Sequence, residues 1–176
     1  MNDRPDDDSI KKVPQISPDS EMAVEVAARL RARGEWLAVA ESCTGGLIAK
    51  TLTDLAGSSE WFERGLVTYS NRSKQDLLGV PVAILERHGS VSRETVEAMA
   101  RGLLAHAPVD WTLAVTGIAG PTGGSAEKAV GLVWIACAGR ETGVATRRFQ
   151  FSGSRETVRA QAASAALQLL LERLNA

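Results

Sequence analysis

A short apolar run over residues 36–40 leads into a polar turn that contains two adjacent glycines, Glu41-Ser42-Cys43-Thr44-Gly45-Gly46. Residues 47–52 then have the composition of a helix, so the segment predicts a strand, a tight turn and a helix. The glycine pair lets the backbone approach a ligand, and the first amides of a helix have no partners within it. Such amides favour an anion. We therefore expect a binding site with Ser42 beside it, although an ordinary N-cap role for Ser42 or Thr44 fits the same pattern.

Strands and helices alternate along most of the chain. Apolar, β-rich runs lie near residues 36, 66, 111, 131 and 144, and segments with helical spacing separate most of them. A glycine-flanked turn at residues 139–143 predicts a hairpin between the last two runs. This order predicts a layered α/β domain with a mixed sheet of about five strands. Ligands in such folds bind outside the carboxyl ends of the strands.

Composition limits the classes of partner. Residues 1–17 are polar and poor in apolar side chains, so we expect a disordered N-terminal tail followed by a single domain over residues 18–176. The net charge of −1 gives no global basic field for nucleic acid. No apolar run approaches the roughly 20 residues of a membrane span, and no signal peptide is evident. We expect a cytoplasmic protein. The two cysteines have no metal-ligand spacing, and no metal site is expected.

Three segments carry the residues that chemistry would need: Ser42 with its glycine pair, Tyr69 with Lys74, and the glycine-rich loop that starts at Thr116. A serine needs a group that takes its proton. Neither histidine lies next to a strand-end motif, so we consider Lys74, whose pKa would have to fall from about 10.4 toward neutrality. Serine–lysine pairs are a known variant of the catalytic triad. Tyr69 would then relay or orient the proton.

Each of these residues also has an ordinary structural interpretation. A lysine on a short polar helix is usually solvated, and Tyr69 fits a core aromatic. Cys43 is a rival nucleophile; in an extended backbone only one of two adjacent side chains faces a ligand, and we favour Ser42. The spacing of Tyr69 and Lys74 is one residue longer than the Tyr-x-x-x-Lys pair of short-chain dehydrogenases, and no P-loop is present.

Several motifs at matching intervals, from about residue 20 to the C-terminus, resemble the CinA C-terminal domain family. They are the segments 41–46, 67–71 with Lys74, 89–92, 116–124 and 151–159. The resemblance implies a three-layer α/β/α sandwich that is usually a homodimer, with no cofactor and no metal. Stand-alone members include nicotinamide-nucleotide amidohydrolases, which hydrolyse the carboxamide of nicotinamide mononucleotide (NMN) to nicotinic acid mononucleotide and ammonia in pyridine nucleotide salvage.

The resemblance also implies roles for individual residues. Ser42 is expected as the nucleophile, Lys74 as the base and Tyr69 as an assisting group. The residues expected to bind the nucleotide are Thr44, Gly45, Gly46, Thr116, Gly117, Gly120, Gly123 and Arg155. Two alternatives stay open at this point: a non-catalytic nucleotide-binding regulatory module of the competence/damage-inducible CinA type, and an amidase for another substrate.

Overall fold

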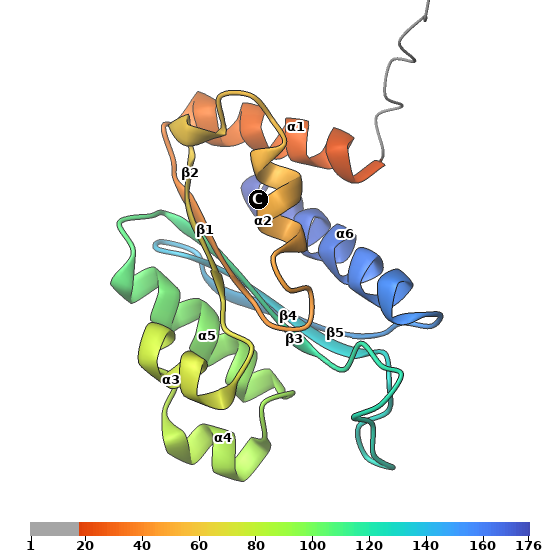
Figure 1. The fold of residues 1–176 in the computed structure, drawn as a ribbon. Coiled ribbons are helices and arrows are strands. Elements are labelled where there is room, and N and C mark those ends of the chain that lie inside the picture. Colours follow the sequence, from red (N-terminus) through yellow and green to blue (C-terminus); the bar gives the residue numbers. More distant parts are fainter. Residues whose placement is uncertain (1–17) are drawn as a thin grey trace, which may run out of the picture.

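The computed structural model describes residues 18–176, so the expected tail over residues 1–17 lies outside the described residues (Figure 1). The strands are β1 (Leu37–Glu41), β2 (Phe62–Val67), β3 (Trp111–Gly117), β4 (Leu132–Gly139) and β5 (Gly143–Gln150). The helices are α1 (Pro18–Arg33), α2 (Leu47–Thr53), α3 (Asn71–Leu78), α4 (Val82–His88), α5 (Arg93–His106) and α6 (Arg155–Leu174), with a 3₁₀ turn, η1 (Ser58–Glu60). The order of strands and helices agrees with the prediction.

The strands form one mixed sheet in the order β2-β1-β3-β4-β5. β1 runs parallel to both of its neighbours, β2 and β3. β4 is antiparallel to β3 and to β5, and the predicted hairpin joins β4 and β5. The carboxyl ends of β1, β2 and β3 therefore meet at one edge of the sheet, where ligands bind in open α/β folds.

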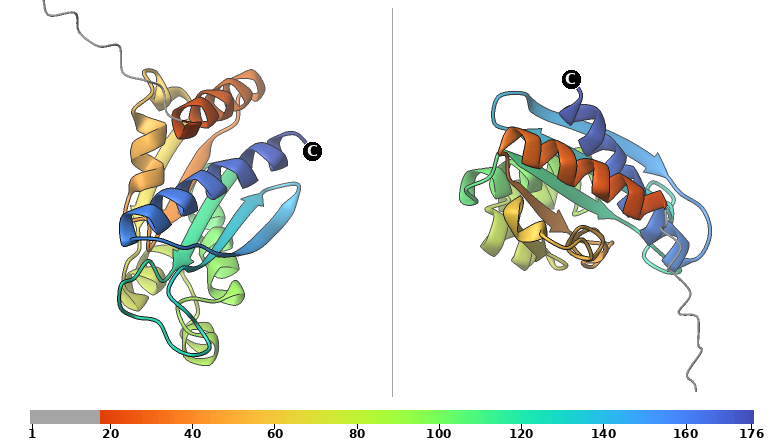
Figure 2. Two further views of the ribbon diagram at one scale, coloured as in Figure 1. Left: turned by 90° about the vertical axis from the view of Figure 1, so that its right-hand side faces the viewer. Right: turned by 90° about the horizontal axis from the view of Figure 1, so that it is seen from above.

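Helices cover both faces of the sheet, as Figures 1 and 2 show. α1, α2 and α6 pack on one face with the larger side chains of the strands, such as Leu37 and Val39, and α3, α4 and α5 cover the other face. Successive residues of a strand point to opposite faces, so Ala38 and Ala40 face α5. The expected three-layer α/β/α sandwich is confirmed.

Small residues bring α5 close to its neighbours. A Cβ atom at Gly102 would lie only 1.8 Å from the carbonyl oxygen of Leu78 at the end of α3. No side chain fits there without moving one of the two helices. The position of α3, which carries Lys74, thus depends on how closely α5 packs against it.

Strand β2 begins and ends earlier than the sequence indicates. We expect a strand over residues 65–69, whereas β2 spans Phe62–Val67, and Tyr69 lies in the loop that follows. Glu63 and Arg64 obscure the strand because they are charged. They are tolerated because β2 is an edge strand whose side chains remain partly exposed.

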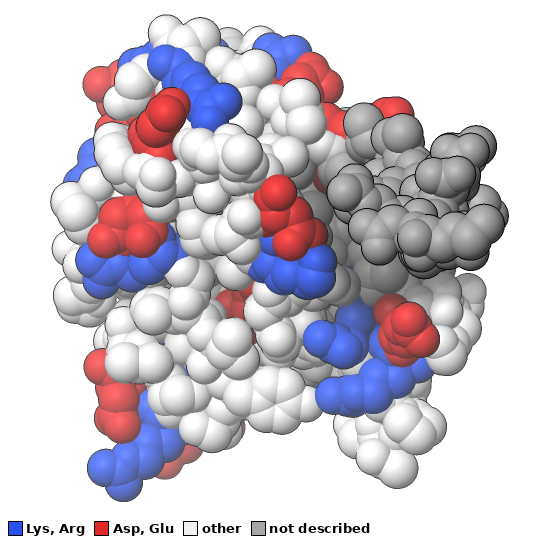
Figure 3. Space-filling view, turned by 45° about the horizontal axis from the view of Figure 1, so that its top comes forward, with Lys and Arg blue, Asp and Glu red and all other residues white. Residues whose placement is uncertain are grey.

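Charges of both signs are mixed on the face that Figure 3 shows, where acidic and basic side chains adjoin instead of gathering by sign. Within residues 18–176, several ion pairs join residues one helical turn apart, such as Arg93 with Glu97 at 2.8 Å. This pattern gives that face no extended basic patch. Over residues 18–176, no helix is both long enough and apolar enough to cross a membrane.

Candidate active site

A cavity of about 490 Å³ lies at the carboxyl ends of the three parallel strands. Ser42 and Cys43 reach it from the end of β1, Tyr69 from the end of β2, and Lys74 from α3. The connection 89–91, much of the loop 116–128 and residue 155 at the start of α6 complete its wall. The three segments singled out in the sequence therefore meet at one site.

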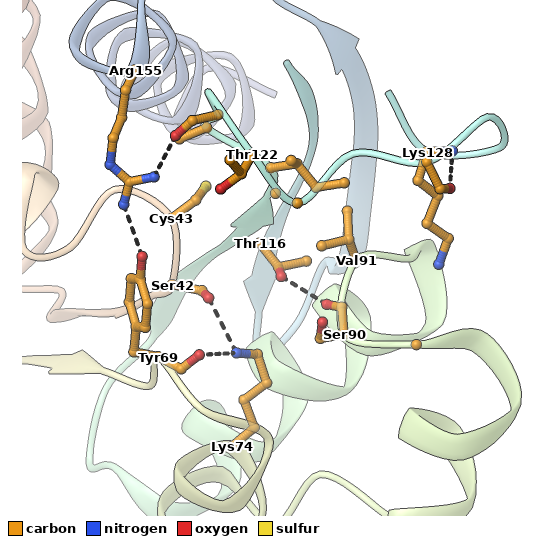
Figure 4. Close-up of a pocket in the computed structure, with 17 residues that line it drawn as sticks. Ser42, Cys43, Tyr69, Lys74, Ser90, Val91, Thr116, Thr122, Lys128 and Arg155 are labelled. Carbon is orange, nitrogen blue, oxygen red and sulfur yellow. Dashed lines mark hydrogen bonds between the residues drawn. The ribbon is translucent and has the colours of Figure 1, made fainter. Parts of the chain in front are cut away.

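Ser42 and Lys74 are in direct contact (Figure 4). Lys74 Nζ donates hydrogen bonds to Ser42 Oγ at 3.1 Å and to the carbonyl oxygen of Thr68 at 2.7 Å. A longer contact of 3.5 Å reaches the carbonyl of Tyr69. Lys74 is 1% exposed and Ser42 is 8% exposed. The lysine is thus buried, which differs from the ordinary solvated interpretation.

Helix α3 explains why Lys74 points inward. Ser70 caps the helix, and its side chain and that of Ser73 form a reciprocal capping box. Lys74 and Leu78, four residues apart, share the face that packs against the protein. The cap fixes where the helix starts, and this start places Lys74 on the buried face.

Burial lowers the pKa of the Lys74 amine to about 8, and the smaller opposing effect comes from Cys43. Desolvation disfavours a charged ammonium, and no salt bridge holds Lys74 in its charged form within residues 18–176. About a tenth of the amine is therefore neutral at pH 7, and about half at pH 8. In this form the nitrogen has a lone pair that can accept the proton of Ser42.

The first amides of α2 have hydrogen-bond partners within the protein, which differs from the expectation that they face a ligand. The carboxylate of Glu41 accepts hydrogen bonds from the amides of Gly46, Ile48 and Ala49 at 3.0, 3.1 and 2.8 Å. The residue at the N-cap position is Gly46, and neither Ser42 nor Thr44 caps the helix through its side chain. The helix amides that we expect to face an anion are already used by this buried carboxylate.

Thr44, Gly45 and Gly46 do not line the cavity. Thr44 is fully buried, and its carbonyl oxygen accepts hydrogen bonds from Arg159 of α6 at 2.7 and 3.2 Å. Gly45 and Gly46 have φ angles of 61° and 96°, which glycine adopts without strain. These three residues therefore determine the shape of the turn that carries Ser42, and they do not contact the cavity.

Cys43 lines the cavity together with Ser42. The argument that only one of the two faces a ligand assumes an extended backbone, and this condition is not met, because both residues follow the end of β1 and lie in a turn. Burial raises the pKa of the Cys43 thiol to about 11. The thiol is protonated at neutral pH, which weakens it as a rival nucleophile.

Tyr69 is not a core aromatic, because its side chain is 60% exposed. Its phenol oxygen accepts a hydrogen bond of 2.8 Å from Arg155, which also donates to the carbonyl of Gly120 at 2.8 Å (Figure 4). The hydroxyl has no hydrogen bond to Ser42 or Lys74 among the described residues. Tyr69 and Arg155 together bridge one side of the cavity.

The glycine-rich loop forms another part of the wall, with Thr116, Gly117, Gly120 and Gly123 among its lining residues. Thr116 donates a hydrogen bond of 2.7 Å to the carbonyl of Ser90. A Cβ atom at Gly120, whose φ is 79°, would lie 2.5 Å from the side chain of Val130. Glycine at position 120 is thus required for the loop to fold back on itself.

Several cavity residues have no role in the sequence prediction: Ser90, Val91, Thr122, Ser125 and Lys128. The segment 89–92 is among the motifs of the resemblance, but its spacing assigns no chemistry to it. Lys128 lies beyond the glycine-rich run, and no sequence pattern places its side chain in this cavity. Within residues 18–176, no group of three His, Cys, Asp or Glu side chains is placed to hold a metal ion.

The chain belongs to the CinA C-terminal domain family, which it matches over residues 19–174. It is 56% identical over 151 residues to nicotinamide-nucleotide amidohydrolase PncC of Enterobacter agglomerans; the match covers 86% of this chain and 92% of that protein. It is also 56% identical over 149 residues to a CinA-like protein of Geotalea daltonii, where the match covers 85% of this chain but 36% of the relative.

The fold is also that of a solved family member. The crystal structure of competence/damage inducible protein CihA from Agrobacterium tumefaciens matches with a TM-score of 0.88 and 42% sequence identity. The match covers 93% of this chain and 100% of that one. The mixed sheet and its two helical layers are therefore those of the family.

Proposed function

We propose that this protein hydrolyses the carboxamide of NMN to nicotinic acid mononucleotide and ammonia. The observation that carries the proposal is the buried contact of 3.1 Å between Lys74 Nζ and Ser42 Oγ, inside a cavity large enough for a nucleotide. The similarity to the Enterobacter agglomerans relative, a nicotinamide-nucleotide amidohydrolase, supports this substrate. Pyridine nucleotide salvage, a cytoplasmic location and a homodimer are parts of the same proposal.

Ser42 and Lys74 divide the chemistry between them. The neutral Lys74 amine accepts the proton of Ser42 as the oxygen attacks the carboxamide carbon. The resulting ammonium then protonates the amide nitrogen, the C–N bond breaks and ammonia departs. Water next attacks the ester on Ser42, and its proton passes through Lys74 to the serine oxygen as the carboxylate product leaves. The positive charge of the pyridinium ring withdraws electrons from this carbonyl, which lowers the barrier to attack.

The oxyanion needs donors other than the helix amides that Glu41 occupies. The backbone amide of Cys43 directly follows Ser42, belongs to a residue that lines the cavity, and donates to no other residue within residues 18–176. We assign the oxyanion to this amide. Losing one such donor typically costs about 3 kcal/mol of transition-state stabilisation.

The remaining cavity residues bind the nucleotide in this proposal. Tyr69 and Arg155 cover the pyridine end beside Ser42, Thr116 with Gly117 and Gly120 supports the sugar, and Gly123 lies toward the phosphate. Thr44, Gly45 and Gly46 act on the substrate indirectly, because they shape the turn that carries Ser42. Tyr69 assists through its backbone carbonyl, which faces Lys74 at 3.5 Å.

The direct test is to incubate the purified protein with NMN and to quantify ammonia and nicotinic acid mononucleotide. We expect both products in equal amounts and no ammonia from free nicotinamide. Tight NMN binding without product would contradict the proposal and would favour a nucleotide-binding regulatory module. Ammonia from a different amide in a substrate panel, with none from NMN, would assign another amidase activity.

A further inference from the structure

Lys128 brings a cation to the part of the cavity wall that lies away from Tyr69 and Arg155. Figure 4 draws it on the opposite side of the cavity, with Ser90 and Val91 between. Its side chain extends from the loop between β3 and β4 toward the end of α4, where Nζ donates a hydrogen bond of 2.7 Å to the carbonyl of His88. Among the described residues, no Asp or Glu lines the cavity. The electrostatic character of this end is therefore positive.

The ammonium of Lys128 retains donors for a ligand. An ammonium has three N–H groups, and within residues 18–176 the contact with His88 is the one hydrogen bond that Lys128 Nζ makes. No salt bridge involves Lys128 in that part of the chain. The neighbouring Glu127 carboxylate is exposed, accepts a hydrogen bond from Ser125 at 2.9 Å, and does not line the cavity.

The loop that runs from Gly120 to Lys128 presents further donors. The backbone amides of Thr122, Gly123 and Gly124 have no acceptor within residues 18–176. Thr122 and Gly123 line the cavity, and Gly123 has a φ angle of 90°. Successive amides in such a turn form a concave anion-binding surface. The loop is closed by the amide of Ser125, which donates to the carbonyl of Lys128 at 2.8 Å.

Arg155 is less suited to hold a phosphate. Two of its nitrogens already donate to Tyr69 and Gly120 at 2.8 Å. Arg155 and Tyr69 lie on the side of the cavity where Ser42 meets Lys74. In NMN the phosphate and the carboxamide are at opposite ends of the molecule. A substrate with its carboxamide at Ser42 directs its phosphate away from this pair.

We propose that Lys128, together with the amides of residues 122–124, binds the phosphate of the substrate and makes the site select a nucleoside monophosphate over the corresponding nucleoside. This inference rests on the proposed function, since it takes the carboxamide to lie at Ser42. The competing interpretation is structural: a lysine that only holds the C-terminal carbonyl of α4.

The test compares NMN with nicotinamide riboside, which has the same carboxamide and pyridinium but no phosphate. We expect Lys128→Met to lower kcat/KM for NMN by about 10- to 100-fold, mainly through KM, because a hydrogen-bonded charge is lost. The kcat/KM for the riboside should change less than about twofold. Lys128→Arg should keep most of the preference for NMN. Lys50→Met, which removes an exposed lysine outside the cavity, serves as the matched control and should change neither value.

A binding measurement separates this inference from the proposed function. Calorimetry with ribose 5-phosphate requires no turnover, and we expect Lys128→Met to weaken its binding at least tenfold, while ribose binds to neither protein. If NMN is not hydrolysed but this difference is found, the proposed reaction fails and the phosphate site stands. Equal losses on NMN and the riboside, or ribose 5-phosphate binding that is absent or independent of Lys128, would overturn the inference and leave Lys128 a structural role.

Discussion

At the scale of single residues, the acid–base chemistry depends on where Lys74 lies. Its amine is enclosed by Ser42 and by the carbonyl oxygens of Thr68 and Tyr69, and no carboxylate contacts it in the described chain. Carbonyl oxygens orient the amine without adding a full negative charge. Burial can then lower the pKa, whereas a neighbouring carboxylate would raise it again.

The rate should follow the titration of Lys74. In the mechanism that we propose the neutral amine is the active form, and its pKa is about 8, so kcat/KM should fall about tenfold per pH unit below pH 8 and level off above it. Initial rates with NMN between pH 6 and 9.5 measure this profile, and thermal unfolding at each pH controls for stability. A profile that is flat across this range would contradict the role of Lys74 as a base.

The sequence predicts the pair to which we assign the reaction, but not the full surroundings of this pair. Ser42 and Lys74 lie in motifs whose types and spacing indicate their chemistry. Glu41 directly precedes Ser42, yet its contacts with the amides of α2 depend on three-dimensional geometry. Lys128 reaches the cavity from a loop whose path follows from the packing of Gly120 on Val130. Such long-range placement leaves no periodic signal in the sequence.

At the scale of secondary-structure elements, Glu41 joins the end of β1 to the start of α2. Its buried carboxylate accepts three backbone hydrogen bonds. We expect Glu41→Gln to lower the free energy of unfolding by about 2 kcal/mol, because the amide group removes a charged acceptor and points a donor at another donor. Urea denaturation measures the change. Glu86→Gln, at an exposed position of α4, is the control, and equal stability of the two variants would refute the capping role.

The close contact between α3 and α5 leads to a second prediction at this scale. Alanine favours a helix over glycine by about 1 kcal/mol, but Gly102→Ala should still lower the free energy of unfolding by about 1–3 kcal/mol, because its Cβ meets the Leu78 carbonyl. It should also lower kcat, since α3 carries Lys74. Chemical denaturation and NMN kinetics provide the measurements. Arg101→Ala, an exposed neighbour, is the control, and a stabilised Gly102→Ala protein would contradict the packing.

Element types were predictable because apolar periodicity and caps act locally. Ser92 and Ser154 cap α5 and α6 at the positions that their sequences indicate. The limits of β2 were less predictable, since its ends are set by pairing with β1, from Leu37 opposite Phe62 to Glu41 opposite Val67. Pairing across strands decides such limits, and a single sequence does not display it.

At the scale of the whole molecule, the sheet is shared by both helical layers. Trp61 is buried in the core beneath α1 and α6, whereas Trp134 packs against the core beneath α5. Since β1, β3 and β4 contribute side chains to both cores, neither layer can lose its packing alone. This arrangement supports the expectation that residues 18–176 form a single domain.

Unfolding should therefore be a single cooperative transition. Two variants test this, one that retains only Trp61 and one that retains only Trp134, with the other tryptophans replaced by phenylalanine. In each variant, the fluorescence transition in urea should coincide with the loss of helix measured by circular dichroism. Fluorescence midpoints that differ from the circular dichroism midpoint in opposite directions would indicate two independent units.

The most direct test of the account concerns the Ser42 hydroxyl. Ammonia release from NMN should be measured for the wild-type protein and for Ser42→Ala under the same conditions, with NMN binding to both proteins recorded by calorimetry. The account predicts that Ser42→Ala still binds NMN but releases ammonia at least about 10³-fold more slowly, because no nucleophile remains beside Lys74. A Ser42→Ala protein that releases ammonia at a rate close to that of the wild type would contradict it.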